Sequence, residues 1–393
     1  MPLRPLVLLA ALLHVYIGLR LLPGLSSFAF AAPVVLLALA VSALSMPLPF
    51  VGLRGGRRQL GVGWKWIGLI SMGWFSSMFV LTMARDLALL AGWLAVLVAG
   101  ASLDAAKWVS WSALAVPLLA TAASLIGFLN ARRTAGVVRV DVPIRNLPAA
   151  LAGFTIAQLS DIHVGPTIRR GYMQRVVDAV NRLGADMVAI TGDLVDGTVP
   201  ELRDHVAPLE GLRARFGTFV VTGNHEYYAG AHAWIAELRR LGMRVLINEH
   251  VVLQTRKVRG AQTDEEELES ALVVAGVTDF TAVHFDASHA SDPGRALHDA
   301  PPLVHTRVLL AHQPRSAPAA AEAGYQLQLS GHTHGGQFFP WNLFVPFQQP
   351  FTAGLHKLRE MWVYTSRGTG YWGPPKRFGA PSEITLLRLV QDA

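Results

Sequence analysis

Long apolar stretches dominate the first 130 residues of the chain. Five of them are nearly free of charge, at about 5–22, 28–47, 64–83, 87–103 and 108–129. About 20 apolar residues are needed to cross a bilayer as a helix. Several such stretches in series cannot all be secretory signals, so we expect a multi-pass helical region of four or five spans over residues 1–133. His14 falls inside the first stretch, where we expect it to make a helix–helix hydrogen bond.

The pattern changes at about residue 134, where short apolar runs begin to alternate with helical stretches and polar turns. The first runs predict strands that end at Asp161, at Asp193 and near Asn224, with an amphipathic helix after the first and a helix through 231–241 after the third. Further strands are expected near 271–277, 307–313, 325–332, 361–368 and 383–390. Strand–helix alternation is typical of an α/β fold. We therefore expect a second, globular domain over residues 134–393.

Charge is divided unevenly between these two regions. Residues 1–133 hold ten of the 34 basic residues and two of the 27 acidic ones, a net charge of +8, which leaves −1 for the remainder. A nucleic-acid-binding domain carries its own positive charge. Nucleic acid is therefore an improbable partner, and the basic residues are expected to flank membrane spans instead.

The face of the membrane on which the globular domain lies stays open at this stage. Arg54, Arg57 and Arg58 mark the loop after the second apolar stretch as cytoplasmic, which puts the N-terminus inside as well. Five spans would then put the globular domain outside. Four spans, with 87–103 not crossing, would put it in the cytoplasm.

Polar residues collect where the predicted strands end. The members of this set are acids, an amide and imidazoles: Asp161, His163, Asp193, Asn224, His225, His312, His332 and His334. Ligands in open α/β sheets lie at the carboxyl ends of the strands, so we expect these side chains to share one rim. Any one of them could be an ordinary turn or capping residue, but the ordered set predicts a site.

The chemical types in this set suit divalent metals. Carboxylate, imidazole and amide oxygen ligands without sulfur favour Mn, Fe or Zn. The chain has no cysteine, which excludes thiolate ligands and thiol catalysis. The glycines beside the set, in TGD, GNHE and GHTHGGQ, allow tight turns and close backbone approach.

The ordered motifs resemble the calcineurin-like metallophosphoesterase family. They are Asp161-Ile162-His163, Gly192-Asp193, Gly223-Asn224-His225-Glu226, His312 and Gly331-His332-Thr333-His334. The GHTHGGQ form and the later SRGTGYWGPPKRFGAPSEITLL are similar to the bacterial membrane-associated branch of YkuE type. The first motif has Ser160 where the family usually has glycine. The resemblance implies a fold of two packed mixed β-sheets flanked by helices, in a bacterial cell membrane protein.

The resemblance also implies a ligand set and a reaction. One metal ion would be held by Asp161, His163 and His334, the other by Asn224, His312 and His332, with Asp193 bridging them. Two ions about 3.5–4 Å apart can share a water and lower its pKa, so a bridging hydroxide would attack phosphorus. His225 would protonate the leaving oxygen or stabilise the transition state.

The substrate class is a phosphomonoester or a phosphodiester. The membrane region and the aromatic segment FFPWNLFVPFQQPF favour a phospholipid or another lipid-linked phosphoester. The alternative is a non-catalytic membrane sensor or scaffold that keeps the metal-binding fold. A transporter is unsupported, since the two acids of the apolar region, Asp86 and Asp104, fall at segment ends.

Overall fold

The computed structural model describes residues 3–50, 61–100, 104–254 and 271–392. The chain divides into two compact units. The first comprises residues 1–132 with 373–378, and the second comprises residues 133–372 with 379–393. The basic residues predicted to mark the cytoplasmic loop, Arg54, Arg57 and Arg58, lie outside the described residues.

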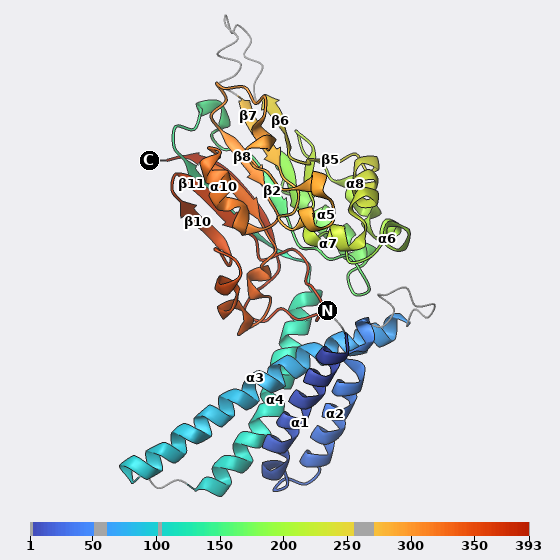
Figure 1. The fold of residues 1–393 in the computed structure, drawn as a ribbon, viewed down its shortest axis with the longest axis vertical. Helices are drawn as coiled ribbons and strands as arrows, with labels where there is room; N and C mark the ends of the chain where they lie inside the picture. The colour runs from blue at the N-terminus through green and yellow to red at the C-terminus, as the bar shows by residue number, and fades with distance from the viewer. Residues whose placement is uncertain (1–2, 51–60, 101–103, 255–270, 393) are drawn as a thin grey trace, which may run out of the picture. The chain divides into compact units, whose positions relative to one another are not determined.

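The first unit is a bundle of long helices. They are α1 (Leu3–Leu25), α2 (Ala31–Ser45), α3 (Val62–Ala99) and α4 (Ala105–Arg132) (Figure 1). Four spans in the described residues are long and apolar enough to cross a membrane: Pro5–Leu25, Ala31–Phe50, Val62–Val98 and Ala105–Arg132. The second of them extends α2 through the short helical turn at Leu48–Phe50. The stretches 64–83 and 87–103 do not form separate helices, because α3 runs through both as far as Ala99. Leucines on the outside of the bundle are exposed, as Leu19 and Leu37 are, which is typical of a surface that faces lipid.

Polar groups inside the bundle are paired. His14 Nε2 lies 2.9 Å from Ser42 Oγ on α2, so the expected helix–helix hydrogen bond is present. Asp86 lies within α3, not at its end, and accepts hydrogen bonds from Tyr16 on α1 at 2.7 Å and from Arg20 at 2.8 Å. These partners satisfy groups that would be costly to leave bare in an apolar bundle.

The short segment 373–378 belongs to the helical unit. The ammonium of Lys376 donates hydrogen bonds to the carbonyl of Gly73 at 2.9 Å, to Ser77 at 2.5 Å and to Ser124 at 3.2 Å. A lysine held between α3 and α4 in this way fixes the segment to the bundle.

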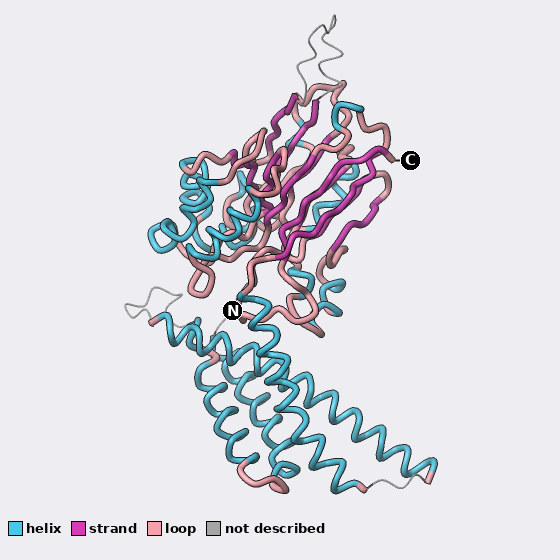
Figure 2. The backbone as a smooth tube through the Cα atoms, turned by 180° about the vertical axis from the view of Figure 1, so that it is seen from behind, coloured by secondary structure: helices cyan, strands magenta, loops and turns pink. Residues whose placement is uncertain are grey.

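The second unit contains two six-stranded mixed sheets, drawn in magenta in Figure 2. The first has the order β1 (Gly136–Ile144), β12 (Glu383–Gln391), β2 (Thr155–Leu159), β3 (Met187–Thr191), β4 (Thr218–Val221) and β5 (Arg244–Val245). The second has the order β10 (Gly354–Leu358), β11 (Met361–Thr365), β9 (Leu327–Ser330), β8 (Arg307–Leu310), β7 (Ala271–Gly276) and β6 (Glu249–Gln254). The predicted α/β fold class is confirmed.

The main core lies between the two sheets. Apolar side chains of both inner faces form one buried cluster, to which Ile156 and Phe219 of the first sheet and Val274 and Leu329 of the second contribute. Helices cover the outer faces: α5 (Arg170–Asn181), α6 (Val199–Val206), α7 (Asn224–Ala229) and α8 (Ala231–Arg240) on one side, and α10 (Ala317–Glu322) on the other (Figure 1). Strands covered on both faces are buried at every position and rich in apolar residues, as β3 is.

The register of the inner strands determines where the polar loops emerge. Strands β2, β3 and β4 pair in parallel, as do β7, β8 and β9, so their carboxyl ends lie at one edge of each sheet. The predicted site residues follow β2, β3, β4, β8 and β9 directly. The fold therefore delivers five polar loops to neighbouring edges.

Candidate metal centre

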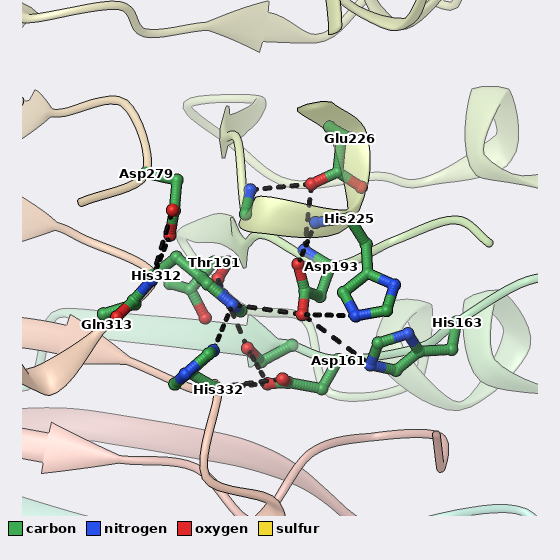
Figure 3. A network of polar contacts seen from close by, with 12 residues as sticks. Asp161, His163, Thr191, Asp193, His225, Glu226, Asp279, His312, Gln313 and His332 are labelled. Atoms are coloured by element: carbon green, nitrogen blue, oxygen red, sulfur yellow. Dashed lines mark hydrogen bonds and ion pairs between the residues drawn. The ribbon is translucent and has the colours of Figure 1, made fainter. Parts of the chain in front are cut away.

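The structure brings six of the seven predicted ligands together with His225 at the strand ends. Figure 3 shows part of this set, with Asp161, His163, Asp193, His225, His312 and His332 facing one another. Three of the ligands form one group: ligand atoms of Asp161, His163 and His334 lie within 4.8 Å of one another. The Nε2 atoms of His163 and His334 are 3.1 Å apart, and His334 Nε2 is 3.4 Å from Asp161 Oδ1. Two imidazole nitrogens and a carboxylate oxygen facing one point are an arrangement that a cation would satisfy.

A second group lies beside the first. His312 Nε2 is 3.2 Å from Asp193 Oδ2 and 3.2 Å from His332 Nδ1. The same oxygen of Asp193 is 3.8 Å from His163 Nε2 in the first group. Asp193 therefore stands between the two groups, in the position that a bridging ligand needs.

Asn224 supplies a buried oxygen that a metal ion could pair. It is the first residue of α7 and is 7% exposed, and its buried Oδ1 has no hydrogen-bond partner among the residues that the structure describes. A buried amide oxygen of this kind costs about 1–3 kcal/mol when left unpaired. A metal ion among oxygen and imidazole ligands would pair it, so the residues present fit the ions that the motifs predict.

The backbone of the site is strained at the ligands themselves. Five of the seven predicted ligands have positive φ angles: Asp161 (51°), His163 (56°), Asp193 (52°), His332 (69°) and His334 (53°). Non-glycine residues rarely adopt this region, and each costs on the order of 1–3 kcal/mol. Strain of this kind persists where the surroundings impose it, and here it turns alternate side chains of each loop toward one point.

Two glycines make room for the carboxylates. A Cβ atom on Gly331 would overlap Ser160 Oγ and Asp161 Oδ2, and one on Gly223 would overlap Asp193 Oδ1. Asp161 also accepts hydrogen bonds from the backbone N–H of His332 at 2.9 Å and from Ser160 Oγ at 2.5 Å. The serine that replaces the family's usual glycine thus helps to orient the first carboxylate.

The pKa values of Asp193, Asp161 and His332 are shifted in different directions by burial and by neighbouring charges. Burial opposes ionisation of Asp193, but the imidazoles of His312 and His225 outweigh it and hold the pKa of Asp193 well below its usual range. Burial raises the pKa of Asp161. Burial also lowers the pKa of His332 to about 3, assisted by the neighbouring His312. A neutral His332 and an ionised Asp193 are the protonation states in which each would bind a cation.

His225 lies at the open side of this centre, where its ring is 16% exposed. Its Nε2 is 3.9 Å from Asp193 Oδ2, and its Nδ1 donates a 2.7 Å hydrogen bond to Asp196 Oδ1. Burial lowers the pKa of His225, but Asp193 and then Asp196 raise it more, to about 9. His225 is therefore protonated at neutral pH.

Asp196 is a residue of the site that the sequence analysis missed. Its Oδ1 accepts hydrogen bonds from His225 Nδ1 and also from His163 Nδ1, at 2.9 Å. Burial opposes ionisation, yet His163 and His225 lower the pKa of Asp196 to about 2. The signal that could have revealed it is its spacing of three residues from Asp193, which places it in the same strand-end loop.

Glu226 supports the loops without facing the metals. Its carboxylate accepts hydrogen bonds from the backbone N–H groups of Gly223 at 2.6 Å, Asp193 at 3.0 Å and Leu194 at 2.8 Å. Burial and then the nearby Asp193 raise the pKa of Glu226 to about 7. This side chain joins the loop after β3 to the loop after β4 and so fixes the spacing of their ligands.

Comparisons with known proteins agree with this geometry. A family model described as calcineurin-like phosphoesterase matches residues 154–336. A Bos taurus protein described as a transmembrane protein with metallophosphoesterase domain is 42% identical over 283 residues, which cover 70% of this chain and 62% of that protein. This chain thus matches less than two thirds of the bovine protein.

Bacterial proteins are similar too. An uncharacterized metallophosphoesterase of Aquifex aeolicus is 31% identical over 236 residues, covering 60% of this chain and 84% of that protein. The uncharacterized metallophosphoesterase YkuE of Bacillus subtilis is 29% identical over 252 residues, covering 62% and 81%. Because vertebrate and bacterial proteins both match, assignment to a bacterial branch stays a prediction. The chain belongs to the calcineurin-like metallophosphoesterase family.

Proposed function

We propose that this protein is a membrane-bound phosphoesterase that hydrolyses phosphoester bonds with two divalent metal ions. The observation that carries the proposal is the convergence of seven Asp and His side chains, His225 among them, from five strand ends. The buried oxygen of Asn224, the residue before His225, supports it, since it has no hydrogen-bond partner among the described residues. Membership of a family of metallophosphoesterases supports the same activity.

The ligands divide into two groups with one shared member. One ion would be held by Asp161, His163 and His334, and the other by Asn224, His312 and His332. Asp193 lies within 4 Å of both groups and would bridge them. Two ions held in this way supply Lewis acidity and an activated water as the nucleophile. The donor set of oxygen and nitrogen without sulfur favours Mn, Fe or Zn.

His225 is suited to act as the general acid. Its Nδ1 is fixed by Asp196, which leaves Nε2 directed toward the centre (Figure 3). A pKa raised to about 9 keeps it protonated at neutral pH, so it can give a proton to the leaving oxygen of the phosphoester. Asp196 acts on the reaction through His225 and His163 and is a positioning residue.

The surroundings of His225 support an apolar or amphipathic substrate. The rings of Tyr228 and Trp372 flank it, with centroids 5.2 and 5.8 Å from its own, and both are more than half exposed. Phe338 is buried, but the aromatic side chains that follow it are exposed: Phe339, Trp341, Phe344 and Phe347. Such aromatic surface favours a phospholipid or another lipid-linked phosphoester, whether monoester or diester.

A membrane location is supported by the four long apolar helices and by the transmembrane relative. If all four helices cross the membrane, the catalytic domain would lie on the same side as the N-terminus and the sequence segment that holds Arg54, Arg57 and Arg58. The positive-inside rule makes this side cytoplasmic, and Arg132 at the end of α4 and Arg133 directly after it agree with this assignment. We therefore propose that the enzyme acts at the cytoplasmic face.

The test is hydrolysis by the full chain purified in detergent. The protein is stripped of metal, then assayed on bis-p-nitrophenyl phosphate and p-nitrophenyl phosphate after addition of Mn, Fe, Zn or Mg, beside Asp193→Asn. We expect activity that depends on added metal and is lost in Asp193→Asn, with the preferred substrate separating diesterase from monoesterase. Bound metal without hydrolysis of these compounds or of lipid extracts would instead favour the sensor or scaffold function.

A further inference from the structure

A second cluster of metal-ligand side chains lies outside the catalytic centre. It consists of His232, Asp286 and His289, whose ligand atoms lie within 4.8 Å of one another. His232 is in the first turn of α8, and the other two come from the loop that follows β7. His232 Nε2 is 3.0 Å from Asp286 Oδ2, and the two imidazole rings are 5.0 Å apart.

Asp286 has one oxygen held and the other directed to the cluster. Its Oδ1 accepts hydrogen bonds from the backbone N–H of Ser288 at 2.9 Å and from the Ser288 hydroxyl at 2.6 Å. Its Oδ2 is the atom nearest His232. The serine therefore fixes the carboxylate in one rotamer, as supporting hydrogen bonds do for carboxylates that bind metals.

His289 is held in place from two directions. It is 9% exposed, its Nδ1 lies 2.8 Å from the hydroxyl of Tyr227, and its carbonyl accepts a 2.7 Å hydrogen bond from Thr278 Oγ1. Burial raises the pKa of Tyr227 to about 12, so the phenol stays neutral. Burial also lowers the pKa of His289, which favours the neutral imidazole that a metal needs. A solvated surface histidine would have neither support.

We propose that His232, Asp286 and His289 bind a third divalent ion, of the Zn²⁺ class, separate from the two catalytic ions. Two imidazoles and one carboxylate are a donor set that zinc takes with water as the fourth ligand. A charge of +2 against one carboxylate would leave the site positive by one, which a bound anion, or hydroxide in place of the water, would neutralise. An ion pair between His232 and Asp286 explains the 3.0 Å contact between them, but not the second imidazole, of His289, fixed beside it.

An ion here would connect the loop after β7 to α8, which directly follows α7, the helix that holds His225. Tyr227, the support of His289, is on α7, two residues after His225. The ring of Phe285, beside Asp286, packs against Tyr227 and against Tyr228, at 5.8 and 5.6 Å. An ion that joins α8 to this loop would fix Phe285 and Tyr228 at the mouth of the catalytic centre. The binding itself does not depend on the phosphoesterase activity.

The experiment counts zinc in the full-length protein in detergent. Metal-stripped protein is dialysed against micromolar Zn²⁺, and metal per chain is measured by mass spectrometry for wild type, His232→Asn and Asp286→Asn. The control is His298→Asn, which removes an exposed histidine that pairs with Asp299 at 2.8 Å in the same connection between β7 and β8. Melting temperatures are recorded with and without Zn²⁺.

We expect His232→Asn and Asp286→Asn each to hold one zinc ion fewer than wild type, and His298→Asn to hold as many. The Zn²⁺-induced rise in melting temperature should shrink in the first two variants only. Equal melting temperatures without metal would show that they fold. The proposal is overturned if all four proteins hold the same number of ions, or if His298→Asn loses as much zinc as the others.

Discussion

Replacing Asp196 with asparagine should shift the pH dependence of catalysis while leaving the site assembled. One oxygen of Asp196 accepts hydrogen bonds from both His163 and His225, at 2.9 and 2.7 Å. The amide oxygen of asparagine can accept both bonds in the same place. The substitution therefore removes the negative charge and keeps the geometry.

The size of the shift follows from the pKa of His225. Burial lowers that pKa, but Asp193 and Asp196 together outweigh burial and raise it from 6.5 to about 9. If Asp196 supplies about one of these pH units, its charge is worth about 1.4 kcal/mol to the imidazolium. His225 gives a proton in its charged form, so activity is present below its pKa and is lost as the pH rises through it.

The assay is kcat against pH for wild type, Asp196→Asn and Asp196→Ala with saturating metal. In Asp196→Asn the alkaline limb should move down by about one pH unit, so the rate falls roughly threefold half a unit below the wild-type pKa and about tenfold well above it. Asp196→Ala also frees both imidazoles and should lose about 10–100-fold in metal affinity or activity. An alkaline limb that stays unmoved in Asp196→Asn would refute the assignment of His225 as the acid.

Three further substitutions test individual parts of the site. His225→Gln should lower turnover by about 10²–10⁴-fold with unchanged metal content, and loss of metal would show that His225 is a ligand instead. Asn224→Leu should lower the metal content of the protein. It should leave the metal-free protein as stable as wild type, or up to about 1–2 kcal/mol more stable, because a buried unpaired oxygen is removed. Thermal melting and metal analysis measure these two effects, and an unchanged metal content would contradict the role of Asn224 as a ligand. Gly331→Ala should displace Asp161 and cost about 1–3 kcal/mol, seen as a lower melting temperature and weaker metal binding, whereas a wild-type melting curve would contradict the close approach.

The strands that were predicted from the sequence are more deeply buried than the strands that were not predicted. The eight predicted strands include every inner strand of both sheets, where apolar runs such as that of β3 are buried on both faces. The four that were not predicted, β1, β5, β6 and β10, are the sheet edges. Edge strands are partly solvated and carry polar residues, as in the LHKL run of β10, so they lack a continuous apolar pattern.

The site was predictable to the extent that its residues follow inner strands. Polar residues directly after an apolar run identify the loops, which accounts for the ligands and for His225. Asp196 was missed because it lies three residues beyond Asp193, and only the fold shows that the loop returns it to His163 and His225. The cluster of His232, Asp286 and His289 was missed for the same reason: Asp286 and His289 follow β7 by ten residues or more, and α8 brings His232 to them.

The number of apolar segments also required the structure. The apolar stretches 64–83 and 87–103 are separated by Arg85 and Asp86. If these two charged side chains faced lipid, a break in the helix would be expected between the stretches. In the bundle Asp86 is paired with Tyr16 and Arg20, so the charges do not interrupt α3. Partners on another helix cannot be inferred from local composition.

The most direct test of the dinuclear centre is a titration of metal-stripped protein in which bound metal and phosphoester hydrolysis are measured in the same samples. The His232→Asn variant serves as the host, because it removes the proposed outer site. We predict that hydrolysis rises with the second equivalent of Mn²⁺ or Zn²⁺ and that Asp193→Asn in this host stays inactive at every ratio. Full activity at one equivalent, or an Asp193→Asn protein as active as its parent, would contradict catalysis by two ions that Asp193 bridges.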